Sequence, residues 1–147
     1  MTATNGILLV EKPSGPTSHD VVNRLRKLAG IRRVGHAGTL DPFASGLLLT
    51  LLGPATRLSE FFLGMDKEYE ADVLVGRETR THDPEGEVVS ESEGWRDLTA
   101  TDLEQALAGL RGRIRQTPPA FSAKKVRGQT AHRRVRRGET VKLDPRP

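Results

Sequence analysis

The sequence predicts an α+β domain in which a mixed, largely antiparallel sheet is flanked by helices. Short strand-like segments are interspersed with segments of helical periodicity, and they do not follow the regular strand–helix alternation of a parallel fold. The 147 residues allow about one domain, and a hydrophobic share of 35% suffices for one core. No apolar run approaches the roughly 18 residues that cross a bilayer, which excludes an integral membrane protein.

A strand and a helix are predicted near the start of the sequence. Residues 7–10 form a short apolar run that ends at a Lys-Pro pair, which indicates a buried strand followed by a turn. Ser18 occupies a position typical of an N-cap, and apolar residues at helical spacing predict a helix over 18–29. Gly30 suits the position just after this helix.

A loop, a strand and a second helix are expected next. Residues 34–46 are rich in glycine and lack periodicity, so we expect a loop there. The apolar run 47–52 is too short for a helix and predicts a strand buried on both faces. Pro54 suits a first helical position, and the helix is expected to run to about Leu63 and to end at Gly64.

The second half of the sequence alternates in a way that predicts a hairpin. Residues 68–75 alternate with Tyr69 on the more apolar side, which indicates a half-buried strand. A turn is expected at 82–86, and residues 87–90 are expected to return antiparallel to the first strand.

A helix and a further strand are predicted after this hairpin. A capping-box pattern at 101–104 precedes apolar residues at helical spacing, which predicts a helix over about 101–111 that ends at Gly112. Residues 121–126 are expected to form a strand.

Charge is distributed unevenly along the chain, although the net charge is only +4. Residues 83–104 contain eight acids and one base, whereas residues 111–138 contain ten bases and no acid. Such a basic block is either a solvated face or a surface that binds a polyanion by releasing condensed counterions. A membrane surface fits less well, because the block has turn-forming residues and little apolar periodicity.

The loop over 34–46 contains the best candidate for a reactive side chain. Asp41 stands before Pro42, and three glycines surround this pair and allow positive φ or close backbone approach: Gly35, Gly38 and Gly46. An aspartate before proline is a common turn initiator, so a structural role stays open. A carboxylate presented by a tight loop between two buried segments also suits nucleophilic or general-base chemistry.

Other common kinds of site fit poorly. The sequence has no P-loop, dinucleotide-binding or nucleophile-elbow motif, and zero cysteines exclude disulfides and thiolate metal sites. The four histidines are scattered singly, which does not favour a metal site: His19, His36, His82 and His132. We therefore expect neither a nucleotide-binding loop nor a histidine-based metal site, and the lack of cysteine is compatible with the cytoplasmic setting that we expect.

Tyr69 is the only tyrosine of the chain. On an inward-facing strand it would most often be a core residue. An aromatic ring facing a nucleic-acid pocket would instead stack on an unstacked base.

Three stretches of the sequence together resemble the tRNA pseudouridine-55 synthases of the TruB family. They read Gly6-Ile-Leu-Leu-Val-Glu-Lys-Pro-Ser-Gly-Pro-Thr-Ser18, Gly35-His-Ala-Gly-Thr-Leu-Asp-Pro-Phe-Ala-Ser-Gly46 and Asp66-Lys-Glu-Tyr-Glu70. The second stretch is the most specific, since it is similar to the family's G-H-x-G-x-L-D-P-x-A-x-G signature at every fixed position. The likeness continues with lower specificity through 118–124 and 136–138.

The resemblance implies a function and a set of site residues. Enzymes of this family isomerise a uridine in the T-arm of tRNA to pseudouridine without metal or cofactor. By the resemblance, Asp41 is the essential carboxylate, His36 contacts the RNA near the flipped base, and Tyr69 stacks on the uracil. Residues expected to support the loop are Lys12, Pro13, Gly35, Gly38, Leu40, Pro42 and Gly46. Basic residues expected to contact T-arm phosphates are Lys124, Lys125, Arg127, Arg133, Arg134, Arg136 and Arg137.

The chemistry suits these residue types, although the sequence leaves the route open. An ionised carboxylate can attack C1′ or C6 of the nucleotide or take a proton at C2′, while stacking restrains the ring and still allows it to turn. The base must first leave its stack, which costs a few kcal/mol that RNA contacts must offset.

We expect a monomer, and the resemblance implies a longer chain. Two positions of the lower-specificity region depart from the family pattern, with His132 where Tyr is usual and Val135 where Ala is usual. We expect residues 1–147 to be the N-terminal portion of the catalytic domain, lacking its later motifs and the C-terminal RNA-binding domain. A non-catalytic RNA-binding fragment that keeps the fold is therefore the alternative function.

Overall fold

The computed structural model describes residues 4–119, 125–126, 128–135, 137–141 and 143–145. The chain divides into two compact units, Met1–Ala71 and Asp72–Pro147. An α+β fold with antiparallel strand pairing is confirmed, since every recorded pairing between strands of the described residues is antiparallel. These strands form one three-stranded sheet in unit 1 and two hairpins in unit 2.

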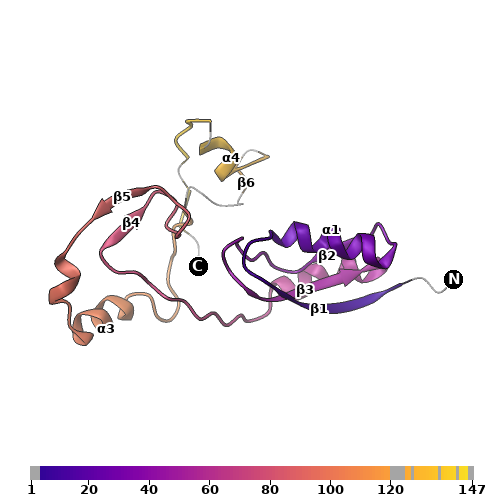
Figure 1. Ribbon diagram of the computed structural model, residues 1–147, viewed down its shortest axis with the longest axis horizontal. Helices are drawn as coiled ribbons and strands as arrows, with labels where there is room; N and C mark the ends of the chain where they lie inside the picture. Colours follow the sequence, from indigo (N-terminus) through magenta and orange to yellow (C-terminus); the bar gives the residue numbers. More distant parts are fainter. Residues whose placement is uncertain (1–3, 120–124, 127, 136, 142, 146–147) are drawn as a thin grey trace. The chain divides into compact units, whose positions relative to one another are not determined.

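Unit 1 is built on a sheet of strand order β1-β3-β2 (Figure 1). Strand β1 (Gly6–Lys12) and strand β2 (Val34–His36) both run antiparallel to the central strand β3 (Gly46–Leu52). The registers place Lys12 opposite Gly46 and His36 opposite Thr50. Lys12 therefore lies where the loop between β2 and β3 ends, and His36 lies at the end of β2 where this loop begins.

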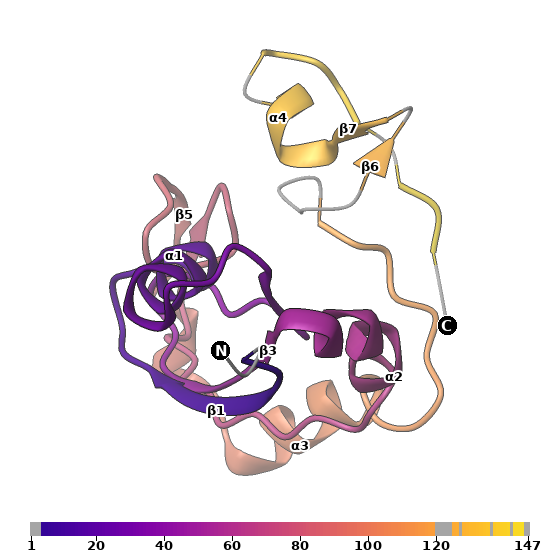
Figure 2. The same cartoon turned by 90° about the vertical axis from the view of Figure 1, so that its right-hand side faces the viewer.

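Helix α1 (Ser18–Ala29) connects β1 to β2 and covers one face of this sheet (Figure 2). Its predicted bounds are confirmed, and Gly30 ends it in the left-handed conformation with φ of 64°. The predicted cap is wrong. Thr17 is the N-cap, because its hydroxyl accepts from the backbone N–H of Asp20 while the Asp20 carboxylate accepts from the backbone N–H of Thr17.

The core of unit 1 involves α1 and both faces of the sheet, since Leu48 and Leu51 point to opposite faces of β3. It contains the almost fully buried side chains of Val22, Val34, Leu48, Leu51 and Ala55. Strand β3 thus supplies buried side chains on both of its faces, as predicted, although Leu47 at its start is 65% exposed.

Two short elements follow β3. A 3-10 helix, η1 (Gly53–Leu58), carries the proline near its start and continues into α2 (Ser59–Leu63), which ends at Gly64. The predicted helix therefore exists within its predicted bounds, but its first half is a 3-10 helix. The loop predicted over 34–46 is shorter than expected, because residues 34–36 pair with β3 as a strand.

The strand predicted over 68–75 is wrong. These residues lie outside any helix or strand and are exposed, and Tyr69 is 70% exposed instead of lying in a core. The hairpin instead uses β4 (Arg77–Thr79) and β5 (Val88–Glu91), joined through the predicted turn at 82–86. Alternation alone did not identify the strand, because a strand also needs a backbone partner in register.

The rest of unit 2 contains short helices and a second hairpin. A 3-10 helix, η2 (Gly94–Asp97), precedes α3 (Ala100–Ala108), which begins at an N-cap on Thr99 and ends at Gly109. The predicted capping box was therefore two residues late, and Gly112 lies three residues beyond the true end. The last elements are β6 (Lys125–Val126), β7 (Gln129–Thr130) and α4 (Ala131–Val135). Most of the strand predicted over 121–126 lies outside the described residues.

Candidate active site

Lys12 is fully buried under the loop that carries Asp41. Its Nζ donates to the carbonyl oxygens of Pro13 at 2.9 Å, Pro42 at 3.2 Å and Ala44 at 2.7 Å. An ammonium group has three N–H donors, so each has an acceptor. The two acceptors on either side of Phe43 belong to the loop, and Lys12 therefore ties the loop to the end of β1.

Ser18 holds the residue just before Asp41. Its Oγ accepts from the backbone N–H of Leu40 at 3.0 Å and donates to the Leu40 carbonyl oxygen at 3.1 Å. The Ser18 side chain is almost fully buried. Because the Thr17 hydroxyl caps α1, the Ser18 hydroxyl is left to bind the loop.

Further bonds fix the loop from both of its ends. The backbone N–H of Gly15 donates to the Pro42 carbonyl at 2.7 Å, and that of Ala37 donates to the Leu49 carbonyl at 2.9 Å. A turn inside the loop is closed by the N–H of Ala44, which donates to the Asp41 carbonyl at 3.1 Å. The backbone around Asp41 is thus held by bonds to β1, α1 and β3.

Only two of the three loop glycines adopt the conformation that glycine favours. Gly38 has φ of 111° and Gly46 has φ of 137°, values that a residue with a Cβ adopts only under strain. Gly35 lies within β2 without a positive φ, and a Cβ there would make only an ordinary contact with Thr56.

His36 lies half-buried at the end of β2. Its Nδ1 donates to the carbonyl oxygen of Gly38, because a carbonyl oxygen can only accept. A neutral ring then carries its proton on Nδ1 and leaves Nε2 as an acceptor. The ring is therefore held in one orientation beside the loop.

Asp41 itself is exposed, in a loop whose backbone is anchored around it. Its carboxylate forms no hydrogen bond or ion pair with the side chains and backbone that the structure describes. The group is thus open to a ligand. Tyr69 lies on the segment after α2, and no recorded hydrogen bond links it to the loop.

The structure therefore brings together some of the residues that were predicted to form the site. Hydrogen bonds connect Lys12, Pro13, Leu40, Pro42 and the His36–Gly38 pair to the Asp41 loop. Ser18 and Gly15 belong to the same network, although Ser18 was predicted to be the N-cap of α1 and Gly15 was not among the predicted site residues. The pair Thr17 and Asp20 has capping-box spacing, and this signal could have assigned the cap to Thr17 and freed Ser18 for the loop.

The basic block of unit 2 is only partly described. Arg134 forms an ion pair with Glu139 at 2.6 Å, Arg137 donates to Gln129, and Arg133 is exposed. Lys125 contributes backbone to β6. The predicted RNA contacts at Lys124, Arg127 and Arg136 lie outside the described residues.

The described part of the chain offers neither a metal-binding cluster nor a membrane-spanning helix. It contains no group of three or more acidic, histidine or cysteine side chains placed to hold a metal ion. None of its helices is long and apolar enough to cross a membrane.

Comparison with known proteins places the chain in a family. The family described as TruB family pseudouridylate synthase (N terminal domain) matches residues 26–147. The chain belongs to this family. The resemblance predicted from the three sequence stretches is thereby confirmed.

Individual relatives agree with this membership. A protein named tRNA pseudouridine synthase B from Arthrobacter sp. (strain FB24) is 50% identical over 143 residues, which cover 97% of this chain and 46% of the relative. The protein of the same name from Aquifex aeolicus (strain VF5) is 48% identical over 141 residues, which cover 96% of this chain and 48% of the relative. The chain spans about half the length of these curated relatives.

A solved structure supports the fold. The structure titled "Crystal Structure of a Cbf5-Nop10-Gar1 Complex" matches with a TM-score of 0.53 and 28% identity, covering 82% of this chain and 31% of the other.

Proposed function

We propose that this TruB family chain contributes the reactive carboxylate for the isomerisation of a uridine in the T-arm of tRNA to pseudouridine. The observation that carries the proposal is the anchored loop that presents Asp41. Buried Lys12 and Ser18 hold the backbone on either side of Asp41, while its carboxylate is exposed. The relatives named tRNA pseudouridine synthase B support uridine in tRNA as the substrate.

This arrangement suits a reaction that needs a fixed nucleophile or base. Replacing the C1′–N1 bond by a C1′–C5 bond requires that the glycosidic bond breaks, that the ring turns, and that the C5 proton leaves. Asp41 attacks the sugar or the ring, or removes a proton from the sugar, and each role needs a carboxylate fixed relative to the flipped nucleotide. The anchored backbone restricts the positions that the Asp41 carboxylate can take.

His36 and Tyr69 have supporting roles in this proposal. The free Nε2 of His36 lies beside the loop, where it contacts RNA near the flipped base. Tyr69 is exposed and so has an aromatic face available for stacking on the uracil ring. The chain is proposed to act as a monomer in the cytoplasm and to need no cofactor, as expected from the sequence.

The release of tritium from tRNA that carries [5-³H]uridine tests the role of Asp41. We expect Asp41→Asn to lower the release by about 10³-fold or more, since a catalytic carboxylate is lost. The matched control is Asp97→Asn, which removes an exposed carboxylate in unit 2 and should release tritium at the unaltered rate. Equal release by Asp41→Asn and the unaltered chain would contradict the proposal. Binding of tRNA by the unaltered chain without any release would support the non-catalytic alternative.

Substitution of Tyr69 tests the stacking role. Tyr69→Leu should leave folding intact, because the side chain is 70% exposed, and should lower turnover by roughly 10- to 100-fold through loss of stacking. Tyr69→Phe keeps the ring and should retain most of the turnover. A loss of tRNA binding that equals the loss of turnover would argue for a binding role alone.

A further inference from the structure

A hollow lined by three cations lies at the C-terminal end of α1. The cavity has a volume of about 410 Å³, and its lining residues are Arg26, Lys27, Gly30, Ile31 and Arg32. Arg26 is fixed there, because its guanidinium donates to the Asn23 side chain and to the Val34 carbonyl, each at 3.0 Å. Its Nε is buried and has no partner among the described residues.

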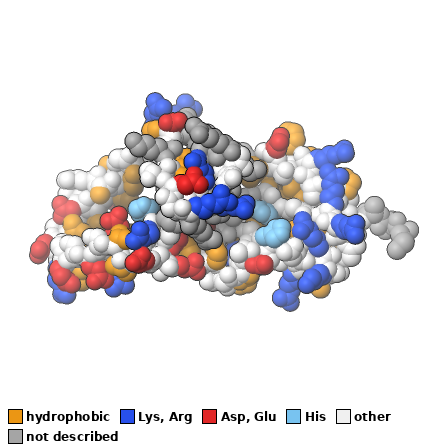
Figure 3. All heavy atoms as spheres, turned by 90° about the horizontal axis from the view of Figure 1, so that it is seen from above, with side chains coloured by type: hydrophobic (Ala, Val, Ile, Leu, Met, Phe, Trp, Pro, Cys, Tyr) orange, Lys and Arg blue, Asp and Glu red, His pale blue; other side chains and the backbone are white. Residues whose placement is uncertain are grey.

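The cations around this hollow have no acidic partners in the described structure. Residues 21–40 contain five Lys and Arg residues and no Asp or Glu. The recorded ion pairs all lie in unit 2, and none involves a residue of α1 or of the α1–β2 connection. Lys27 and Arg32 are exposed. Blue side chains gather over the α1 part of the molecule in Figure 3, whereas red and blue side chains intermix over the β4–β5 and α3 part.

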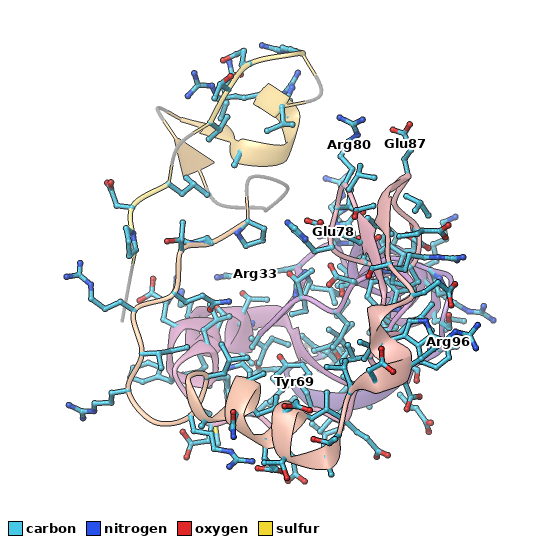
Figure 4. The ribbon with its side chains drawn as sticks, turned by 90° about the vertical axis from the view of Figure 1, so that its left-hand side faces the viewer. Arg33, Tyr69, Glu78, Arg80, Glu87 and Arg96 are labelled. Carbon is cyan, nitrogen blue, oxygen red and sulfur yellow. The ribbon has the colours of Figure 1, made fainter. Side chains whose placement is uncertain are left out.

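Arg33 extends this cationic surface next to the hollow. Its Nε donates to the Thr56 hydroxyl at 2.6 Å, and the Thr56 hydroxyl donates to the Gly53 carbonyl. These bonds fix the side chain over η1, and Figure 4 shows its end pointing away from the ribbon. A guanidinium held in this way presents its remaining N–H groups in the planar fork that matches phosphate oxygens.

We propose that Lys27, Arg32 and Arg33 form a second RNA contact, which binds backbone phosphates away from the catalytic loop. Helix α1 separates the two places: Ser18 at its start binds the Asp41 loop, and the hollow lies after its 12 residues, about 18 Å further along the axis. The inference rests on the proposed function in taking RNA as the polyanion. A bilayer surface fits poorly, because Leu28 is the only large apolar side chain of α1 recorded as exposed, whereas membrane-surface helices present a broad apolar face.

The salt dependence of tRNA binding tests this contact on the full chain. The test variant is Lys27→Gln/Arg32→Gln, and the matched control is Arg77→Gln/Arg80→Gln. Both change the net charge by the same amount, but Arg77 and Arg80 are already paired with Glu91 at 2.8 Å and Glu87 at 3.1 Å. Figure 4 shows the Arg80–Glu87 pair on the β4–β5 hairpin.

We expect the test variant to bind labelled tRNA about tenfold more weakly at about 50 mM salt and to lower the slope of log K against log salt by about 1.5, since two phosphate contacts are lost. The control should keep both values close to those of the unaltered chain. Fluorescence anisotropy between about 50 and 200 mM salt gives the slope, and circular dichroism verifies folding of both variants.

Three outcomes would overturn the inference. An unchanged slope in the test variant would show that these cations do not meet phosphates. Equal losses in test and control would show that only net charge matters. Loss of binding to anionic vesicles with unchanged tRNA binding would assign the surface to lipid. Failure of the proposed function can be told apart from failure of this inference, because Asp41→Asn should bind tRNA with an unaltered salt slope. Absence of tRNA binding by the unaltered chain would contradict both proposals.

Discussion

Helices α1 and α3 begin with the same capping arrangement but differ in what they bury. In α1 the Thr17 hydroxyl donates to the Asp20 carboxylate at 2.6 Å, and in α3 the Thr99 hydroxyl donates to Asp102 at 2.5 Å. Helix α1 buries Val22 against the sheet of unit 1, whereas no residue of α3 is buried. Capping therefore fixes where each helix begins, while burial depends on a sheet face that only α1 has.

The same contrast holds for the two units as a whole. Unit 1 has a small apolar core and three buried polar side chains. Lys12 and Ser18 bind atoms of the Asp41 loop, and the Thr50 hydroxyl donates to the Leu8 carbonyl oxygen. Among the described residues of unit 2, the buried apolar side chain is that of Ala131. Most of the ion pairs in unit 2 join exposed side chains. Substitutions should consequently cost much more stability in unit 1 than chemically similar substitutions in unit 2.

The largest difference in the loss of unfolding free energy is expected between substitutions of two lysines that both donate to backbone carbonyls. Lys12→Met keeps the aliphatic chain but removes the donor of the Pro13 and Ala44 carbonyls and one of the two donors of the Pro42 carbonyl, which keeps its bond from Gly15. Since each unsatisfied buried group costs about 1–3 kcal/mol, we expect unit 1 to lose about 3 kcal/mol or more of its free energy of unfolding. Lys67→Met is the control, because Lys67 is exposed while donating to Leu63 and Met65. It should cost less than about 1 kcal/mol.

Urea unfolding, together with proteolysis of the loop over 37–45, measures this effect. Similar unfolding free energies for Lys12→Met and Lys67→Met would contradict the view that Lys12 anchors the loop.

A smaller difference in unfolding free energy is expected between substitutions of one leucine in each unit. Leu51 lies near the end of the central strand β3 and is 0% exposed, and Leu51→Ala should lower the free energy of unfolding by about 3 kcal/mol through lost burial and a cavity. Leu107 on α3 is 47% exposed, and Leu107→Ala should cost about 1 kcal/mol or less. Thermal unfolding of the two variants gives the comparison. A larger loss for Leu107→Ala would show that α3 buries its apolar side in solution.

The smallest effect concerns the two caps, which should respond alike to pH. The Thr17 hydroxyl and then its backbone N–H lower the pKa of Asp20, and the same groups of Thr99 lower the pKa of Asp102. A lowered pKa in the folded chain means that the cap stabilises its helix above the ordinary aspartate pKa of about 3.9 and loses this effect as the pH falls through the folded value. Helicity followed by circular dichroism should therefore fall in acid, and less so in Asp20→Asn and Asp102→Asn.

The cap hydroxyls provide the control for this pH effect. Thr17→Ala and Thr99→Ala should each cost about 1 kcal/mol of local helix stability, because each cap has the same bonds. A much larger cost for Thr17→Ala would show that the cap also supports the neighbouring Ser18–Leu40 contact.

The sequence by itself determined the elements whose signals are local. The bounds of α1 follow from apolar spacing and from Gly30, and the end of α2 follows from Gly64, because capping bonds join residues only a few positions apart. The loop motif around Asp41 was also visible, since its glycines and its Asp-Pro pair are contiguous. Asp41 and His36 could thus be chosen before their surroundings were known, and Tyr69 followed from the separate stretch 66–70 through the family resemblance.

Only the tertiary structure decided what holds these residues. Lys12 reaches Ala44 across 32 positions of sequence and Ser18 reaches Leu40 across 22, so no local pattern records these bonds. The same limit explains the strands: residues 34–36 form one because β3 supplies a partner, whereas residues 68–75 alternate without one. Backbone hydrogen bonds between strands need a second segment in register, and its position is a property of the folded chain.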